Sequence, residues 1–129
     1  MARAKAEIGL AHYAVQIEAG GHAIVADEPQ ANGGANAGPA PYDLLLMSLA
    51  ACTSITLRMY ADRKQWDMRS LKVDLHYLRE GESERIDRKL RLEGDLSDDQ
   101  RARMADIAER TPVTLTLKKG LPIKTELVR

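Results

Sequence analysis

The sequence predicts an α+β fold in which antiparallel sheets pack around one long central helix. A long apolar stretch without Gly or Pro follows Pro41, and pairs of segments that alternate apolar and polar residues stand before and after it. A capping-box pattern then introduces an amphipathic segment near residue 98. These observations predict the order β-β-α-β-β-α-β. A chain of 129 residues is expected to form a single domain, residues 1–129.

The central helix is predicted over residues 41–64. Pro41 suits a first helical position because its missing N–H is no loss there. Asp43 lies near the positive end of the helix dipole, and the last two residues of the segment are basic. No side chain between Leu44 and Leu57 is charged, and Cys52, the only cysteine, lies among them. Helices that are apolar nearly all round are buried in a core.

A membrane span is the competing interpretation of this helix. The uncharged stretch, residues 44–57, is shorter than the ~20 residues that a bilayer requires. It also contains polar residues, namely Ser48, Thr53, Ser54 and Thr56. We therefore expect a buried helix and no membrane partner.

A strand hairpin is predicted over residues 12–27. Tyr13, Val15 and Ile17 alternate with less apolar residues, and Gly20-Gly21 is typical of a tight turn. The loop that follows, residues 28–40, is rich in Gly, Asn and Ala. Loops of this kind lie at the surface, so this one is either a lid or a simple connection.

Two further strands are predicted over residues 71–79 and 85–94. Alternation gives each strand one apolar and one polar face, as in an antiparallel sheet covered on one side by helices. The apolar face carries Leu71, Val73, Leu75 and Tyr77 from the first strand and Ile86, Leu90 and Leu92, beside Arg88, from the second.

A second helix is predicted over residues 98–111, and a last strand over 121–128. Ser97 and Gln100 form the capping-box pattern, and Thr111-Pro112 marks the helix end. Residues 113–117 are expected to form another turn of helix. The last strand is predicted from the alternation of Leu121, Ile123, Thr125 and Leu127.

Composition argues against several classes of partner. Lys plus Arg and Asp plus Glu balance at 19 each, so no net field favours nucleic acid or an anionic membrane. His12, His22 and His76 fall at no metal-ligand spacing, and no phosphate-loop or dinucleotide motif occurs, so no metal or cofactor is expected. A single cysteine and the lack of an apolar signal segment predict a reducing, cytoplasmic location.

Two interpretations of Cys52 follow from the residues alone. Free cysteines are most often buried and act as small hydrophobic side chains. A reactive thiolate in the middle of a helix would need a nearby cation or hydrogen-bond donor. No cation lies on this face, so an Arg or Lys would have to come from elsewhere in the fold or from another subunit. The helical-wheel neighbours of Cys52 are Leu45, Ser48, Leu49, Ile55, Thr56 and Met59.

Several motifs together resemble the OsmC/Ohr family of osmotically inducible and organic hydroperoxide resistance proteins. The resemblance centres on the run 38–61, which begins Gly-Pro-Ala-Pro-Tyr-Asp and contains Ala-Ala-Cys-Thr. It extends over most of the chain and looks like the OsmC-like branch. The other matching segments are Asp27-Glu28-Pro29, Gly33-Gly34, Asp87-Arg88, Gly94-Asp95-Leu96 and Thr111-Pro112-Val113 with Leu115.

The resemblance implies an intertwined homodimer with the two long helices in its middle and two sites at the interface. Family enzymes are thiol peroxidases that reduce organic hydroperoxides without metal or flavin. Cys52 matches their peroxidatic cysteine, whose thiolate attacks the O–O bond and becomes a sulfenic acid.

This sequence departs from the family pattern at three positions. Thr111 stands where the resolving cysteine belongs, so an external thiol must reduce the sulfenic acid. Tyr42 stands where the family has its glutamate, ten residues before the cysteine and therefore ~15 Å away along a straight helix. Asp43 either replaces that glutamate or begins the helix. Arg3, the only Arg before the helix, is the candidate for the activating arginine.

Two functions follow as hypotheses. The first is a one-cysteine thiol peroxidase for small lipophilic hydroperoxides, with Cys52, Asp43 and Arg3 as catalytic candidates. The second is a catalytically inactive OsmC-like dimer that binds a small apolar ligand or a partner protein; a structural protein with an inert thiol is a third option. The substrate-binding candidates of the first hypothesis are Tyr42, Leu45, Ser48, Leu49, Thr56, Met59 and Thr111.

Overall fold

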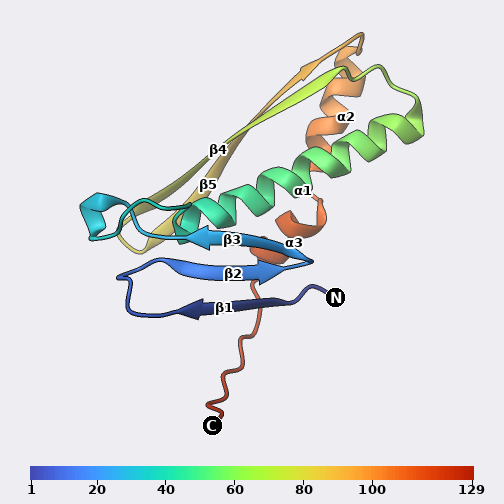
Figure 1. Ribbon diagram of the computed structural model, residues 1–129. Helices are drawn as coiled ribbons and strands as arrows, with labels where there is room; N and C mark the ends of the chain where they lie inside the picture. The colour runs from blue at the N-terminus through green and yellow to red at the C-terminus, as the bar shows by residue number, and fades with distance from the viewer. The chain divides into compact units, whose positions relative to one another are not determined.

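The computed structural model describes residues 1–129 (Figure 1). The chain forms two compact units, Met1–Leu45 and Leu46–Arg129. The boundary falls inside the long helix α1, Pro41–Lys64, whose bounds are those predicted. Two antiparallel sheets and three α-helices confirm the α+β class. The observed order is β-β-β-α-β-β-α-α, with one short 3₁₀ helix before α1.

The first unit contains a three-stranded antiparallel sheet in the order β1-β2-β3. Strands β2 (Val15–Ala19) and β3 (His22–Ala26) form the predicted hairpin, in which Ala19 pairs with His22. Both residues of the Gly20-Gly21 turn have positive φ, which explains the choice of glycine. Strand β1 (Ala4–Ile8) was not predicted, and it pairs with β2 from Ala4–Ala19 to Ile8–Val15.

The loop between β3 and α1 is tied to the sheet by Asp27. This buried carboxylate accepts N–H groups from Glu28 at 2.7 Å and from Ala35 and Ala37 at 3.1 Å each. A Cβ on Gly38 would lie 1.8 Å from the carbonyl oxygen of Val25, so only glycine fits there. These contacts favour the interpretation of the loop as a simple connection over its interpretation as a lid. The 3₁₀ helix η1, Gln30–Asn32, lies within this loop.

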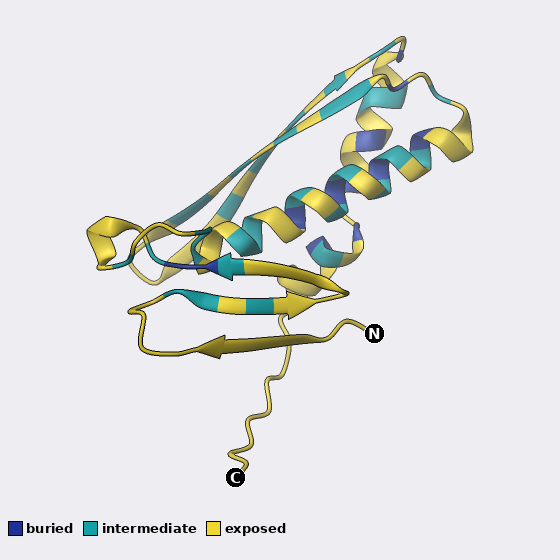
Figure 2. Cartoon of the chain, in the orientation of Figure 1, coloured by how far each residue is buried: buried dark blue, intermediate teal, exposed yellow.

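The second unit pairs strands β4 (Ser70–Glu80) and β5 (Ser83–Glu93) along their whole length, Ser70 facing Glu93. The last part of α1 and helix α2 (Asp98–Ala108) supply most of the buried core (Figure 2). The core residues are Leu57, Ala61, Met68, Leu96, Met104 and Ala108.

Helix α2 begins as predicted and ends earlier than predicted. Ser97 accepts the Gln100 N–H at 3.1 Å, and the Gln100 side chain accepts the Ser97 N–H at 2.9 Å. The predicted helix 98–111 is wrong at its end, because α2 stops at Ala108. Thr111 is extended because it precedes Pro112, and a second helix, α3 (Pro112–Lys119), begins there.

The predicted strand 121–128 is not formed. Residues 120–129 have no regular structure, and Leu121, Ile123 and Leu127 are exposed. A strand requires a neighbour for its N–H and C=O groups, and no strand of this chain pairs with the segment.

Helix α1 is buried along one side only. Leu49, Thr53, Leu57 and Ala61 follow one another at four-residue spacing on the buried side. Met47, Ile55 and Met59 are exposed on the opposite side, so the helix that was expected to be buried is buried along one side in the single chain. By length and composition alone, α1 is long and apolar enough to cross a membrane, and 22% of its most apolar 18-residue segment is buried. The core helix of a soluble protein meets the same criteria.

Candidate functional site

The sulfur of Cys52 meets the beginning of helix α3. The Val113 N–H donates a hydrogen bond to Cys52 Sγ at 3.4 Å, although the two residues are 61 positions apart. Thr56, one turn further along α1, places its Oγ1 3.9 Å from the sulfur. The cysteine is half-buried and forms no disulfide.

Local sequence explains why a donor is available at this point. The first N–H groups of a helix have no partner within it. Pro112 occupies the first turn of α3 and has no N–H, and Thr111 makes no side-chain capping bond. The Val113 N–H therefore has no acceptor within α3 and donates to the sulfur from the positive end of a helix dipole, which favours a negative charge on the sulfur.

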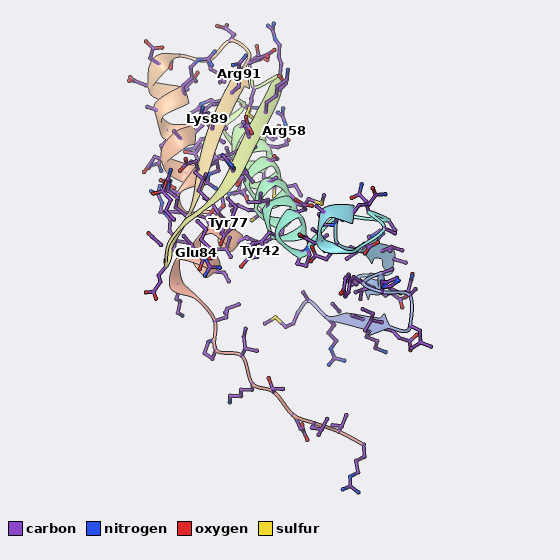
Figure 3. All side chains as sticks on the ribbon, turned by 90° about the vertical axis from the view of Figure 1, so that its left-hand side faces the viewer. Tyr42, Arg58, Tyr77, Glu84, Lys89 and Arg91 are labelled. Carbon is purple, nitrogen blue, oxygen red and sulfur yellow. The ribbon has the colours of Figure 1, made fainter.

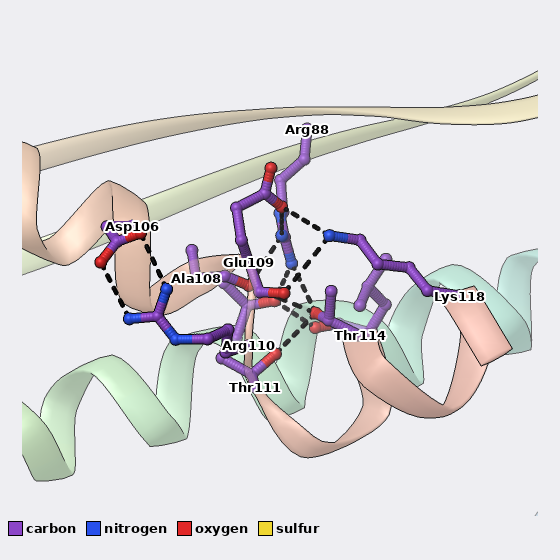
Figure 4. Close-up of polar contacts among 10 residues, drawn as sticks. Arg88, Asp106, Ala108, Glu109, Arg110, Thr111, Thr114 and Lys118 are labelled. Atoms are coloured by element: carbon purple, nitrogen blue, oxygen red, sulfur yellow. Dashed lines mark hydrogen bonds and ion pairs between the residues drawn. The ribbon is translucent and has the colours of Figure 1, made fainter.

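Arg88 connects three elements beside this contact (Figure 4). Its Nη1 donates to Thr53 Oγ1 at 3.0 Å and to Thr114 Oγ1 at 2.9 Å. Its Nη2 donates to the carbonyl of Ala108 at 2.8 Å and to the Glu109 carboxylate at 3.1 Å. The side chain is only 12% exposed, so these bonds are made largely out of water.

Three buried threonines complete the network. Thr53 donates from Oγ1 to the Leu49 carbonyl at 2.7 Å while it accepts from Arg88. Thr111 and Thr114 share a hydrogen bond of 2.6 Å between their hydroxyls. No buried side-chain nitrogen or oxygen is left without a partner. The polar cluster is therefore fully satisfied, as a buried network must be to be stable.

A cavity of about 480 Å³ opens beside Arg88 and is partly apolar. Glu109 lies at its wall, paired with Arg88 and with the Lys118 ammonium at 3.4 Å. The remaining lining residues are Leu49, Ile86, Leu90, Ala105, Ala108, Thr114 and Leu117. A second cavity, of about 400 Å³, is lined by Ser54, Ile55, Arg58, Met59, Met68 and Leu71.

The structure distributes the predicted substrate-binding residues of the second unit over different surroundings. Thr56 lies beside the sulfur, Leu49 lines the larger cavity and Met59 lines the smaller one. Ser48 is exposed, on the side of α1 away from the core. Thr111 is completely buried at the start of α3, and its hydroxyl is bonded to Thr114.

The remaining candidates lie in the first unit. The Asp43 carboxylate accepts the Ala40 N–H at 3.0 Å, the bond of a residue that begins a helix. Arg3 is exposed just before β1, Tyr42 is half exposed, and Leu45 is partly buried. Their roles toward Cys52 stay predictions.

Sequence reasoning did not identify Arg88, Thr53, Thr114 or the Val113 N–H as parts of a site. One signal was present, because Arg88 is the only charge among the apolar, inward-facing positions of β5. Its exposed neighbours Lys89 and Arg91 lie on the other face of the strand (Figure 3). No group of three or more His, Cys, Asp or Glu side chains is placed to hold a metal ion.

Comparison with known proteins identifies the fold. An OsmC-like protein of Mycoplasma pneumoniae superposes with a TM-score of 0.75 at 19% identity, over 92% of this chain and 87% of that one. The organic hydroperoxide resistance protein OsmC of Legionella pneumophila gives 0.67 at 17% identity, over 92% and 89%. OhrB of Bacillus subtilis, an organic hydroperoxide resistance protein, gives 0.60 at 20% identity, over 90% of each chain.

By sequence, no curated protein matches the chain. The family model of OsmC-like proteins, however, matches residues 33–126, which include all of α1, both long strands and the Thr111-Pro112 junction. Because that range is most of the chain, this protein belongs to the OsmC-like family.

Proposed function

We propose that this protein is a one-cysteine thiol peroxidase that reduces organic hydroperoxides through Cys52. The observation that carries the proposal is the hydrogen bond from the Val113 N–H to Cys52 Sγ. A donor at a helix N-terminus stabilises the thiolate, and the thiolate is the nucleophile. Two structural relatives are named as organic hydroperoxide resistance proteins, which supports organic hydroperoxides as the substrate class here.

The reaction uses the two electrons of the sulfur. The Cys52 thiolate attacks the terminal oxygen of R–O–O–H, the S–O bond forms and the O–O bond breaks. The alkoxide takes a proton and leaves as R–OH, so that the cysteine becomes a sulfenic acid. Two equivalents of an external thiol then regenerate the thiol of Cys52 and release a disulfide and water.

An external thiol is required because the chain has no second cysteine. Thr111 stands at the position of the family's resolving cysteine, and its hydroxyl cannot form a disulfide. A low-molecular-weight or protein thiol of the reducing cytoplasm fits this requirement, and we place the protein there.

We further propose that the working form is a homodimer. The exposed residues Met47, Ala51, Ile55 and Met59 follow one another at four-residue spacing and form an apolar stripe along α1. Residues 120–129 have no regular structure and no strand partner, and they expose Leu121, Ile123 and Leu127. A second copy would cover the stripe and pair with the segment. Because OsmC family proteins are soluble, membership favours this arrangement over a membrane for α1.

A non-catalytic role has one observation in its favour. The cavity of about 480 Å³ beside Leu49 has both apolar and charged lining residues and could hold a small molecule without the participation of Cys52. Native mass spectrometry of the purified protein tests this alternative, which predicts a bound molecule that Leu49→Trp displaces.

Stopped-flow oxidation with cumene hydroperoxide tests the peroxidase. We expect a second-order rate constant far above that of free cysteine, with formation of one sulfenic acid per chain. Cys52→Ser is the matched control, because it keeps the size of the side chain and removes the sulfur. A rate equal to that of free cysteine in a folded protein overturns the proposal.

A further inference from the structure

The Arg88 side chain is hydrogen-bonded to α1, which carries Cys52, and to α3, which carries the N–H donor of its sulfur. Its Nη1 donates to Thr53 of α1 and to Thr114 of α3, at 3.0 and 2.9 Å. These two threonines directly follow Cys52 and Val113 in the sequence. One nitrogen atom therefore holds the residue next to the sulfur and the residue next to its donor.

The sulfur contact needs such support. Helix α3 has eight residues, too few for a helix to be stable by itself. Its N-cap residue, Thr111, makes no side-chain capping bond. The N–H to sulfur distance is 3.4 Å, and both the hydrogen bond and the dipole effect weaken quickly with distance. A small displacement of the first turn of α3 would therefore remove the donor from Cys52.

The hydrogen bonds of Arg88 hold α1, the end of α2 and the start of α3 at fixed distances from one another. The Ala108 carbonyl, at the end of α2, accepts a hydrogen bond from the second guanidinium nitrogen, Nη2, at 2.8 Å. The partner Glu109 is 60% exposed, so its ion pair contributes little compared with the three buried acceptors. A planar guanidinium donates to all these acceptors at once from two nitrogens, whereas a lysine has a single ammonium nitrogen and cannot replace all of these bonds.

We propose that Arg88 is a positioning residue for Cys52, which keeps the first turn of α3 on the sulfur so that the Val113 N–H stabilises the thiolate. It acts through Thr53 and Thr114 and does not itself react. Its consequence for peroxide reduction rests on the proposed function, but its effect on the thiol does not.

The test compares Arg88→Lys with Arg101→Lys. Arg101 is a matched control, because it lies in the same unit, is partly buried and donates to the carbonyls of Leu92, Gly94 and Leu96. Both variants lose a buried arginine network, but only Arg88 is linked to the neighbours of Cys52. The readouts are the rate of Cys52 alkylation by iodoacetamide between pH 5 and 9, the cumene hydroperoxide rate and the melting temperature.

In Arg88→Lys we expect alkylation at neutral pH to slow by about three- to tenfold and its pH profile to move to higher pH, the size of effect that a helix terminus has on a charge. Arg101→Lys is expected to lower the melting temperature without a change in the profile. An Arg88→Lys protein that is folded and has the wild-type profile overturns the proposal, as does an equal shift in Arg101→Lys.

Thr114→Val decides the question if Arg88→Lys does not fold. This variant removes the bond from Arg88 to α3 and keeps the shape of the side chain, and the same direction of change is expected. An unchanged profile in folded Thr114→Val contradicts the proposal. A wild-type protein that does not reduce peroxide, but whose alkylation profile moves in these variants, refutes the peroxidase and retains the role of Arg88.

Discussion

The Val113 N–H and the Cys52 sulfur lie 3.4 Å apart, at the point where the first turn of α3 meets the middle of α1. A cysteine in mid-helix receives no help from its own helix terminus, and here a second helix supplies that terminus instead. The contact depends on Pro112 and Thr111, which begin α3 and leave the Val113 N–H without an acceptor in its own helix. Thiol chemistry at this position is thus a property of the tertiary fold.

The Thr56 hydroxyl is expected to contribute little to the reactivity of Cys52. Its oxygen is 3.9 Å from the sulfur, at the long limit for a hydrogen bond that involves sulfur. In Thr56→Val the cumene hydroperoxide rate constant should stay within about twofold of the wild type, because a bond so long is weak. A tenfold loss in stopped-flow measurements would assign the hydroxyl a direct role.

Thr111 is expected to act in stability and not in substrate binding. It is completely buried, and its hydroxyl is bonded to that of Thr114 at 2.6 Å. Thr111→Val should lower the free energy of unfolding by about 1 kcal/mol, the usual value of one buried hydrogen bond. Urea denaturation measures this change. A specific rise in the peroxide KM without loss of stability would restore the substrate-binding interpretation.

Asp43 is expected to begin the helix and not to take part in catalysis. Its carboxylate accepts the Ala40 N–H at 3.0 Å, and it lies nine residues before Cys52, or about 13 Å along the axis. Asp43→Ala should cost about 1 kcal/mol of stability, as the loss of a helix cap does, and leave the peroxide rate unchanged. Asp43→Asn, which keeps an acceptor, should cost less. A large loss of rate in both variants, with normal stability, would favour the catalytic role.

Acid should release the loop that Asp27 holds. The hydrogen bond from Ala37, then those from Glu28 and Ala35, lower the pKa of the Asp27 carboxyl against the opposing effect of burial. Because the folded pKa is depressed, the contribution to stability is present above the unfolded value and is lost as the pH falls through the folded value. Below a pH of about 4 the amides of Ala35 and Ala37 should lose protection from hydrogen exchange beyond the intrinsic trend.

Asp27→Asn is the control for this measurement. An amide does not titrate, so the variant should have weaker protection of Ala35 and Ala37 at neutral pH and no extra loss in acid. The same acid-dependent loss in Asp27→Asn would show that another group governs the loop.

The parts of the fold that were predicted from the sequence carry their own local signals. Pro41 at the start of α1, the Gly20-Gly21 turn and the Ser97–Gln100 capping box each act within a few residues, and each stands in the structure as predicted. Strand β1 alternates apolar and charged residues over Ala4–Ile8, but the segment is only five residues long and all of them are exposed, so its pattern is a weak signal. Pairing with β2 decides its conformation. Residues 121–128 have the alternation but no neighbour within the chain.

Around the sulfur, the sequence predicted Cys52 and its neighbour Thr56 on the same helix, but no residue from another element, for a similar reason. The sulfur stands in a motif that can be read along the chain, whereas its donor and its supporting arginine come from positions 61 and 36 residues further on. Arg88 lies opposite Leu75 in the β4–β5 register, among apolar neighbours. An isolated charge on an inward face indicates a buried network, but its partners become known only when the helices are placed.

The apolar stripe of α1 is expected to form the dimer interface. Ile55 and Met59 are 54% and 59% exposed, values high for such side chains in a helix of this apolarity. Ile55→Lys places a charge in the middle of the stripe and should convert a dimer to monomers or raise its dissociation constant at least about a hundredfold, because burial of an unpaired charge costs several kcal/mol. Analytical ultracentrifugation over a range of concentrations measures the change. Glu82→Lys, a charge change in the exposed β4–β5 turn, should leave the dimer intact. A wild-type protein that is monomeric at micromolar concentration contradicts the dimer, and an Ile55→Lys protein that stays dimeric places the interface elsewhere.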